Sequence, residues 1–344
     1  MELNIYDFTP ETLEGYLGNV PRFRTRQIYK WIFAGKTPDE MTNVPKDLRE
    51  KLKNECYTKL PKIDIKLVSK LDGTVKYLFR MEDDAGIESV VMPYHHGRTI
   101  CVSSQAGCRM GCAFCASTID GLDRNLSSGE IIGQILAAER DTGERISNVV
   151  IMGSGEPLDN YDNVLDFIRN AVNPDGLGLS ARHITLSTCG LVDKMRQLAG
   201  ENLPINLAVS LHAPNDEIRK KLMPIAKSVP IEKLVSESRK YFDMTHRRVT
   251  FEYALIRGVN DSVENAKELS ALLGGFSGFH VNLIPVNHVE ERAFQKSEKA
   301  TAEMFVKTLE KAGTQVTVRR KMGADIDAAC GQLRRAAKRK DNCL

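Results

Sequence analysis

The chain has 344 residues, of which 42% are hydrophobic and 27% are charged, with a formal net charge of +3. This composition is ordinary for a globular protein, and the length suits one large core with a small appended unit. No apolar run approaches the roughly 20 residues of a membrane span, the first residues lack a secretory pattern, and eight cysteines do not indicate a disulfide framework. We therefore expect a cytoplasmic protein without membrane contact, and a monomer.

The first sixty residues predict short helices. Thr9 and Pro10 form a helix start, residues 22–33 carry apolar side chains at helical spacing, and Pro45 opens a third helix that runs to about Cys56. The single tryptophan, Trp31, is expected in the core rather than on a base-stacking surface. We predict that residues 1–60 form an accessory domain.

From Ile63 the hydrophobic period changes to two, which is typical of strands. A turn at Asp72-Gly73 precedes a strand over 75–79, and further strands are predicted over 87–92 and 99–103. Residues 61–98 are thus expected to form a β-meander that links residues 1–60 to the main domain, residues 99–344.

After residue 125 the pattern alternates between helices and strands. The predicted helices are 128–142, 161–171, 191–199, 216–222, 231–242, 262–273 and 299–312. The predicted strands are 148–152, 183–187, 205–211, 248–255, 280–284 and the possible edge 315–319. This alternation predicts a parallel sheet of the partial (β/α)6 barrel type, open on one side.

The stretch between these two regions, CVSSQAGCRMGCAFC, carries three cysteines in one C-x3-C-x2-C cluster, Cys108, Cys112 and Cys115. Such spacing suits a loop around a metal centre, which Gly107 and Gly111 would allow to bend. Soft thiolates select zinc or iron–sulfur clusters, and a zinc site usually adds a second Cys/His pair that is missing here. Three ligands leave one iron of a [4Fe–4S] cluster open, and the stretch resembles the radical S-adenosylmethionine (SAM) enzymes.

Polar residues follow several predicted strands, where β/α barrels place their chemistry. They are Gly155 and Glu156, Ser187, Ser210 with Leu211 and His212, and Asn287. A structural role for His212 is as well supported as a ligand role. Basic clusters occur at Arg22, Arg24 and Arg26, at residues 319–321 and in the C-terminal tail, where they favour phosphate contacts only weakly. For Cys330, spacing alone favours a packed structural cysteine.

Together the motifs CVSSQAGC, CAFC, MGSGEPL, LSTCG, AVSLHAPND and GADIDAACGQL closely resemble the RlmN/Cfr family of radical SAM ribosomal RNA adenosine methyltransferases. The resemblance runs from about residue 9 to the C-terminus and is greater to the C2-methylating branch, which also acts on a tRNA adenosine beside the anticodon. It implies a [4Fe–4S] cluster on Cys108, Cys112 and Cys115. It also implies SAM binding by Gly155, Glu156, Ser187, Ser210, Leu211, His212 and Asn287.

The resemblance further implies a methyl-cysteine mechanism that consumes two SAM molecules. Cys330 would carry the methyl group, Glu88 would remove the C2 proton, and Cys101 would release the product by forming a disulfide with Cys330. The expected partners are 23S rRNA, tRNA and an electron-donating flavodoxin or ferredoxin system. Cys189 departs from the small non-thiol residue expected in many relatives, so it could compete for disulfide formation with Cys101 or Cys330, and the sequence does not show whether it does.

Three alternatives stay open. The C8-methylating relatives would use the same cofactors, and another radical SAM reaction would need neither Cys101 nor Cys330. A zinc-binding RNA module without enzymatic activity would leave the residues at the strand ends unexplained.

Overall fold

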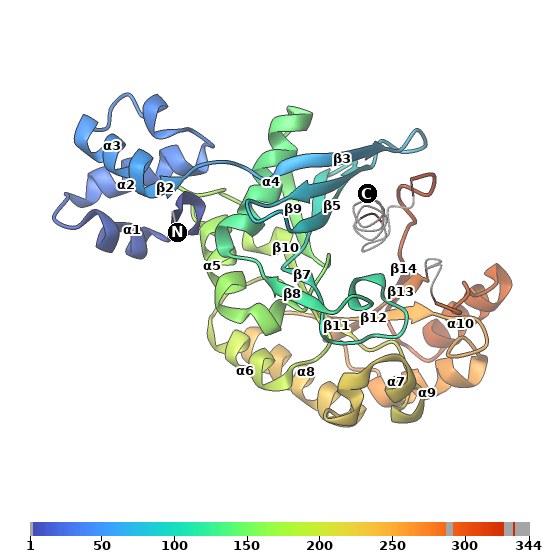
Figure 1. Cartoon of the computed structure of the whole chain (residues 1–344). Coiled ribbons are helices and arrows are strands. Elements are labelled where there is room, and N and C mark those ends of the chain that lie inside the picture. The colour runs from blue at the N-terminus through green and yellow to red at the C-terminus, as the bar shows by residue number, and fades with distance from the viewer. Residues whose placement is uncertain (1–2, 287–291, 327–332, 334–344) are drawn as a thin grey trace.

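The computed structural model describes residues 3–286, 292–326 and 333. In this part of the chain, ten strands form one sheet in the order β14-β13-β12-β11-β10-β9-β6-β5-β4-β3. In this order, each pair of neighbouring strands between β14 and β6 is parallel, whereas the pairs β6-β5, β5-β4 and β4-β3 are antiparallel. The sheet curves with its two edges, β3 and β14, unpaired with each other, and helices lie along its outer side (Figure 1). The predicted open (β/α)6 barrel is confirmed.

The parallel strands are β6 (Gly97–Val102), β9 (Ile146–Ile151), β10 (Ile184–Thr188), β11 (Asn206–Ser210), β12 (Val249–Leu255), β13 (Phe279–Pro285) and β14 (Val316–Val318). The helices between them are α4 (Ser128–Thr142), α5 (Tyr161–Val172), α6 (Val192–Gly200), α7 (Asp216–Leu222), α8 (Ile231–Thr245), α9 (Val263–Leu273) and α10 (Lys299–Lys311). Most bounds lie within three residues of those expected from periodicity, because caps define them: α4 starts at a capping box between Ser127 and Glu130 and ends at left-handed Gly143.

The meander strands are β3 (Lys62–Val68), β4 (Val75–Arg80) and β5 (Gly86–Tyr94). They continue the barrel sheet, because β5 pairs with β6 along Val90–Tyr94 and Gly97–Cys101. Gly73, in the turn between β3 and β4, has φ +72°, which favours glycine. The meander thus lengthens one wall of the barrel beyond its parallel part.

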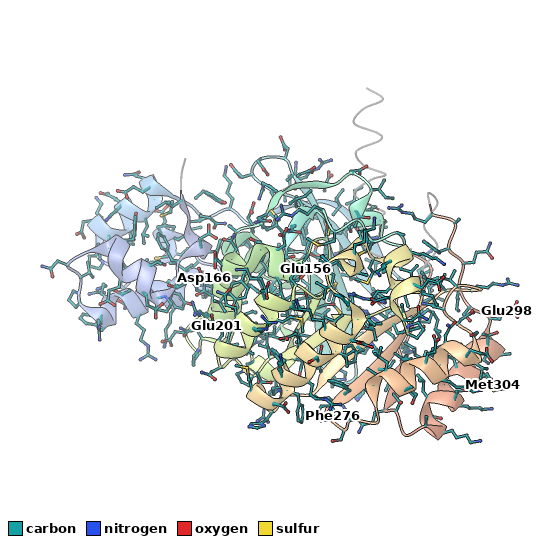
Figure 2. The ribbon with its side chains drawn as sticks, turned by 90° about the horizontal axis from the view of Figure 1, so that it is seen from below. Glu156, Asp166, Glu201, Phe276, Glu298 and Met304 are labelled. Atoms are coloured by element: carbon teal, nitrogen blue, oxygen red, sulfur yellow. The ribbon has the colours of Figure 1, made fainter. Side chains whose placement is uncertain are left out.

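The N-terminal unit contains α1 (Pro10–Leu17), α2 (Arg22–Phe33), α3 (Lys46–Glu55) and the short parallel strands β1 (Leu3–Asn4) and β2 (Cys56–Tyr57). It lies at one end of the molecule (Figures 1 and 2). A buried amide fixes it there: Asn170 on α5 accepts from the Tyr29 hydroxyl at 2.8 Å and donates to the Phe8 carbonyl at 3.1 Å. Trp31 is partly buried against the core, as predicted, and its indole N–H donates to Asn43.

The hydrophobic periodicity of the sequence does not predict the antiparallel strands β7 (Gln105–Gly107) and β8 (Leu122–Asn125), because both are very short. They bracket the cysteine loop and hold its two ends together. The chain also forms short 3₁₀ helices, η1 (Ile5–Asp7), η2 (Pro38–Glu40), η3 (Ala116–Thr118), η4 (Pro157–Asn160), η5 (Ala181–His183) and η6 (Pro224–Lys227). Across the described residues, none of the helices combines the length and the apolar character that a bilayer span requires.

Candidate active site

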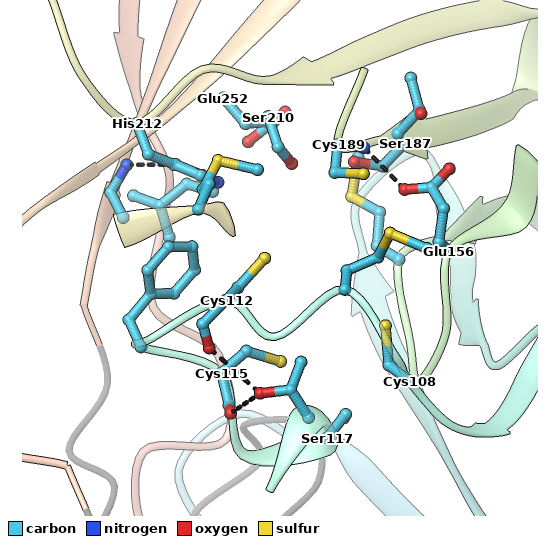
Figure 3. Close-up of a pocket in the computed structure, with 18 of the residues that line it drawn as sticks. Cys108, Cys112, Cys115, Ser117, Glu156, Ser187, Cys189, Ser210, His212 and Glu252 are labelled. Carbon is cyan, nitrogen blue, oxygen red and sulfur yellow. Dashed lines mark hydrogen bonds between the residues drawn. The ribbon is translucent and has the colours of Figure 1, made fainter. Parts of the chain in front are cut away.

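A pocket of about 280 Å³ lies at the carboxyl ends of the parallel strands, where the fold predicts chemistry. The three clustered cysteines line it together with residues from five successive strands, β9 to β13 (Figure 3). The predicted site residues in its wall are Cys108, Cys112, Cys115, Gly155, Glu156, Ser187, Ser210 and His212. Segments as far apart in the sequence as Cys108 and Arg319 therefore meet at one cavity.

The cysteine loop is held by its own main chain. Gly107 and Gly111 have φ +86° and +70°, so the backbone bends at both as expected. The Cys115 N–H donates to the Cys112 carbonyl at 3.1 Å, and the Thr118 hydroxyl donates to the carbonyls of Cys112 and Cys115. The loop keeps the three thiols pointing into the pocket (Figure 3).

Burial raises the pKa of Cys108 to about 12 and that of Cys112 still further. Metal binding needs the thiolate, so a cation in the pocket must supply the free energy of deprotonation. A single metal ion would need three or more His, Cys, Asp or Glu side chains around one point. The described residues contain no such group. A four-iron cluster instead takes one thiolate on each of three irons, and soft donors around one cavity fit it.

Glu156 is 3% exposed at the glycine-rich turn after β9. Its two carboxylate oxygens accept from the backbone N–H groups of Leu158, at 3.0 Å, and Cys189, at 2.7 Å. Burial raises the pKa of Glu156, and these hydrogen bonds oppose the rise. A carboxylate has about four acceptor positions, so this fixed group can also accept from a ligand ammonium.

His212 has a left-handed backbone, with φ +54°, and its Nδ1 accepts from the Ala254 N–H at 2.9 Å. Burial and the charge of Arg219 lower its pKa to about 3. The ring is therefore neutral with its proton on Nε2, and it meets Phe114 of the cysteine loop edge-on at 4.8 Å. His212 therefore both accepts a buried main-chain hydrogen bond and lines the pocket.

Glu88 and Cys101 lie outside the pocket wall but on one face of adjoining strands. Leu78 pairs with Glu88 and Val90 with Cys101, so these residues share one side of the pleat. Cys101 is 4% exposed and packs with Met152, which also lines the pocket. The structure thus brings the two predicted catalytic residues to the flank of the cysteine site.

Some predicted residues contribute elsewhere or cannot be placed. Leu211 is fully buried in the hydrophobic core, and its N–H donates to the Glu252 carbonyl. Asn287 and Cys330 lie outside the described residues. Cys189 lines the pocket, where burial and the Glu156 charge raise the pKa of its thiol well above the ordinary value. The raised pKa favours the neutral thiol of Cys189. Cys189 and Cys101 belong to two different apolar clusters.

Sequence reasoning missed Glu252 on β12 and Arg319 after β14, which also line the pocket. Glu252 is 4% exposed, and its two carboxylate oxygens accept from the Asn282 amide nitrogen, at 3.0 and 3.3 Å. A carboxylate inside the otherwise apolar run VTFEYAL was the available signal. The sequence places Arg319 in a surface basic cluster, but its side chain is half-buried. Its charge opposes the rise that burial causes in the pKa of Glu252.

Comparison with known proteins adds independent evidence. Residues 102–269 match the Radical SAM superfamily, and residues 3–58 match the ribosomal RNA large subunit methyltransferase N-terminal domain. The chain is 54% identical to a probable dual-specificity RNA methyltransferase RlmN of Alkaliphilus oremlandii over 97% of this chain and 98% of that one. It is 52% identical to the like-named protein of Clostridium novyi over 96% and 98%.

Among solved structures, the chain is similar to a radical SAM methyltransferase from Sphaerobacter thermophilus, with a TM-score of 0.90 and 43% identity over 96% of this chain and 98% of that one. The pocket with three thiols, the two matched domains and these near full-length relatives agree. The chain belongs to the RlmN family of radical SAM RNA methyltransferases, whose cofactors are a [4Fe–4S] cluster and SAM.

Proposed function

We propose that this enzyme methylates C2 of one adenosine in 23S rRNA and an adenosine beside the anticodon of tRNA. The relatives named dual-specificity RNA methyltransferases support the two RNA substrates. The observation that carries the proposal is the placement of Glu88 and Cys101 on one face beside the three-thiol pocket. A radical SAM enzyme of another class has no use for this pair. C8 methylation of the same rRNA adenosine is the alternative.

The bound cluster and SAM supply the radical chemistry, because adenine C2 is electrophilic and offers no nucleophile for ordinary methyl transfer. The protein contributes a methyl acceptor, a base and a resolving thiol. Cys330 carries the methyl group to the base, and Glu88 accepts the C2 proton. Cys101 then attacks the sulfur of Cys330, so that a disulfide forms as the bond to the methylated nucleoside breaks.

Residues 322–325, which precede Cys330 in the sequence, contact the meander and the apolar cluster that contains Cys101. Asp325 accepts from the Ser69 hydroxyl at 2.6 Å and from the Lys70 N–H at 2.9 Å. The Gly323 N–H donates to Asp72 at 2.9 Å, and Met322 packs in the cluster that contains Cys101. The turn between β3 and β4 therefore anchors residues 323–325, five residues before Cys330 in the sequence.

The match of residues 3–58 to a ribosomal RNA methyltransferase domain supports RNA contact by the N-terminal unit. An adenosine in folded RNA must leave its stack before C2 can approach the pocket. The reaction also needs low-potential electrons, for which we propose a flavodoxin- or ferredoxin-class donor. We also propose a cytoplasmic location, which the proposed RNA substrates and donor support.

The test compares variants expressed in cells together with their RNA. Cys330→Ala should yield neither C2-methyladenosine nor an RNA–protein link, because it has no methyl acceptor. Cys101→Ala and Glu88→Gln should instead accumulate a covalent RNA adduct, seen as a nuclease-sensitive shift in denaturing gels. Cys56→Ala, a buried thiol of the N-terminal unit, is the matched control and should methylate normally. Normal methylation by Cys101→Ala, or 8-methyladenosine in nucleoside mass spectra, would contradict the proposal.

A further inference from the structure

Arg219 on α7 is fully buried, although it carries a permanent positive charge. Its two terminal nitrogens donate to main-chain carbonyls, that of Val229 at 3.0 Å and that of Cys189 at 3.0 Å. Its Nε is also buried and has no hydrogen-bond partner among the described residues. Burying a charge is costly unless an opposite charge offsets it. The guanidinium therefore indicates negative charge nearby, and the Asp216 carboxylate at the start of the same helix is one group of the chain that supplies part of it.

The cysteine loop packs directly against the segment that carries Arg219. The Ala113 N–H of the loop donates to the Leu222 carbonyl at the end of α7, at 2.8 Å. Cys112 and Phe114 pack in one apolar cluster with Leu222 and Met223. A Cβ on Gly111 would come within 3.3 Å of Pro224, so the loop and this segment are in close contact.

From the other side, Arg219 holds the main chain of Cys189, whose side chain is in the pocket wall with Cys108 and Cys112. The guanidinium thus lies behind the wall, between two stretches that face the cluster ligands.

We propose that Arg219 is a positioning residue that compensates the negative charge of the cluster thiolates and favours the reduced cluster. Three thiolates leave the bound cluster with excess negative charge, which grows by one unit when a flavodoxin-class donor delivers an electron. A fixed cation in a low-dielectric wall stabilises that added charge, and net charge is one determinant of cluster potential. The inference does not depend on which RNA carbon is methylated.

The test is the midpoint potential of the anaerobically loaded cluster, followed by electron paramagnetic resonance with dithionite as reductant and without SAM. Arg219→Met and Arg219→Gln should lower the ratio of reduced to oxidised cluster at least tenfold at a fixed potential, a shift of about 59 mV for a one-electron couple. Arg219→Lys keeps the charge and should shift the ratio less. Arg247→Met is the matched control: its half-buried guanidinium also has an unpartnered Nε, but it lies by Asn206 at the opposite ends of the strands.

An unchanged potential in both neutral variants, with normal iron content, would overturn the proposal. A shift that occurs only after SAM is added would assign the charge to the SAM carboxylate and overturn it as well. If the neutral variants fold but take up no iron, while Arg219→Lys does, the charge requirement is supported. Loss of iron in all three variants would mean that Arg219 only clamps the carbonyls of Val229 and Cys189.

Discussion

The ammonium Nζ of Lys76 on β4 lies 3.1 Å from Oε2 of Glu88 on β5, and these side chains are 1% and 2% exposed. From the sequence, Glu88 would be a solvated strand carboxylate. The pairing of β4 with β5 places it instead inside the barrel wall beside a lysine. This relationship gives the proposed base a fixed orientation and offsets the cost of burying its charge.

Lys76→Met should destabilise the protein by about 3–5 kcal/mol, because it leaves a buried carboxylate without this partner. The double variant Lys76→Met/Glu88→Leu should recover much of that loss, although it lacks the proposed base. Urea unfolding measures both. Equal stability of the single and double variants would show that the ion pair is not the source of the effect.

Anaerobically reconstituted protein should bind about four irons. Cys108→Ala, Cys112→Ala and Cys115→Ala should each lose most of this iron and the brown absorbance of the cluster, because each removes the thiolate of one iron. Iron and sulfide assays check this, with Cys56→Ala as the control that keeps both. Stoichiometric zinc without iron uptake would refute the cluster assignment.

His212 predicts a pH dependence of stability. Its pKa is about 3 in the folded chain, below the 6.5 of a free histidine, so the unfolded state binds more protons between these values. The free energy of unfolding should therefore fall as pH drops from 6.5, at up to about 1.4 kcal/mol per pH unit from this group.

The variant His212→Asn, which tolerates a left-handed backbone, should flatten that slope. His246→Asn is the control, because His246 has the same backbone conformation, with φ +53°, but is exposed. Denaturant titrations of both variants from pH 7 to pH 5 make the comparison. Equal slopes in His212→Asn and the parent chain would contradict the prediction.

Asp325→Asn should loosen the segment that leads into Cys330. It weakens the charge-assisted hydrogen bonds that the Asp325 carboxylate accepts from Ser69 and Lys70. Limited trypsin digestion after Lys321 should accelerate, and methyl transfer should slow. Asp39→Asn, which removes a surface ion pair with Lys53, should change neither rate. An unchanged digestion rate would show that the anchor contributes little.

The arginines of α2 differ in their surroundings, and RNA binding should reflect this. Arg22 pairs with Glu14 and is 89% exposed, whereas Arg26 pairs with Asp175 of the barrel domain. Neutralising Arg22 and Arg24 should flatten the dependence of RNA affinity on salt, by about 0.7 in log–log slope for each lost phosphate contact. Arg26→Gln should instead weaken the docking of the N-terminal unit. An unchanged slope in Arg22→Gln/Arg24→Gln would place the RNA surface elsewhere.

The sequence alone determined the local structure and the chemistry of the cysteine loop. Alternating periodicity predicted the strands, caps predicted the helices, and the spacing of Cys108, Cys112 and Cys115 indicated a cluster with one open iron. These features depend on neighbours within a few residues or on a repeat that the chain itself carries, so local reasoning was sufficient. The glycine-rich turn that holds Glu156 was predicted for the same reason.

Only the tertiary structure decided which distant residues meet. Glu252 and Arg319 line the pocket, Lys76 pairs with Glu88, and Arg219 is buried against the main chain of Cys189. In its own segment of the sequence, each of them looks like an ordinary charged surface residue. A charged side chain is costly to bury, so sequence reasoning assigns it to the surface by default. The fold reverses that assignment where strands pair and helices pack around one cavity, because the compensating partner comes from another part of the chain.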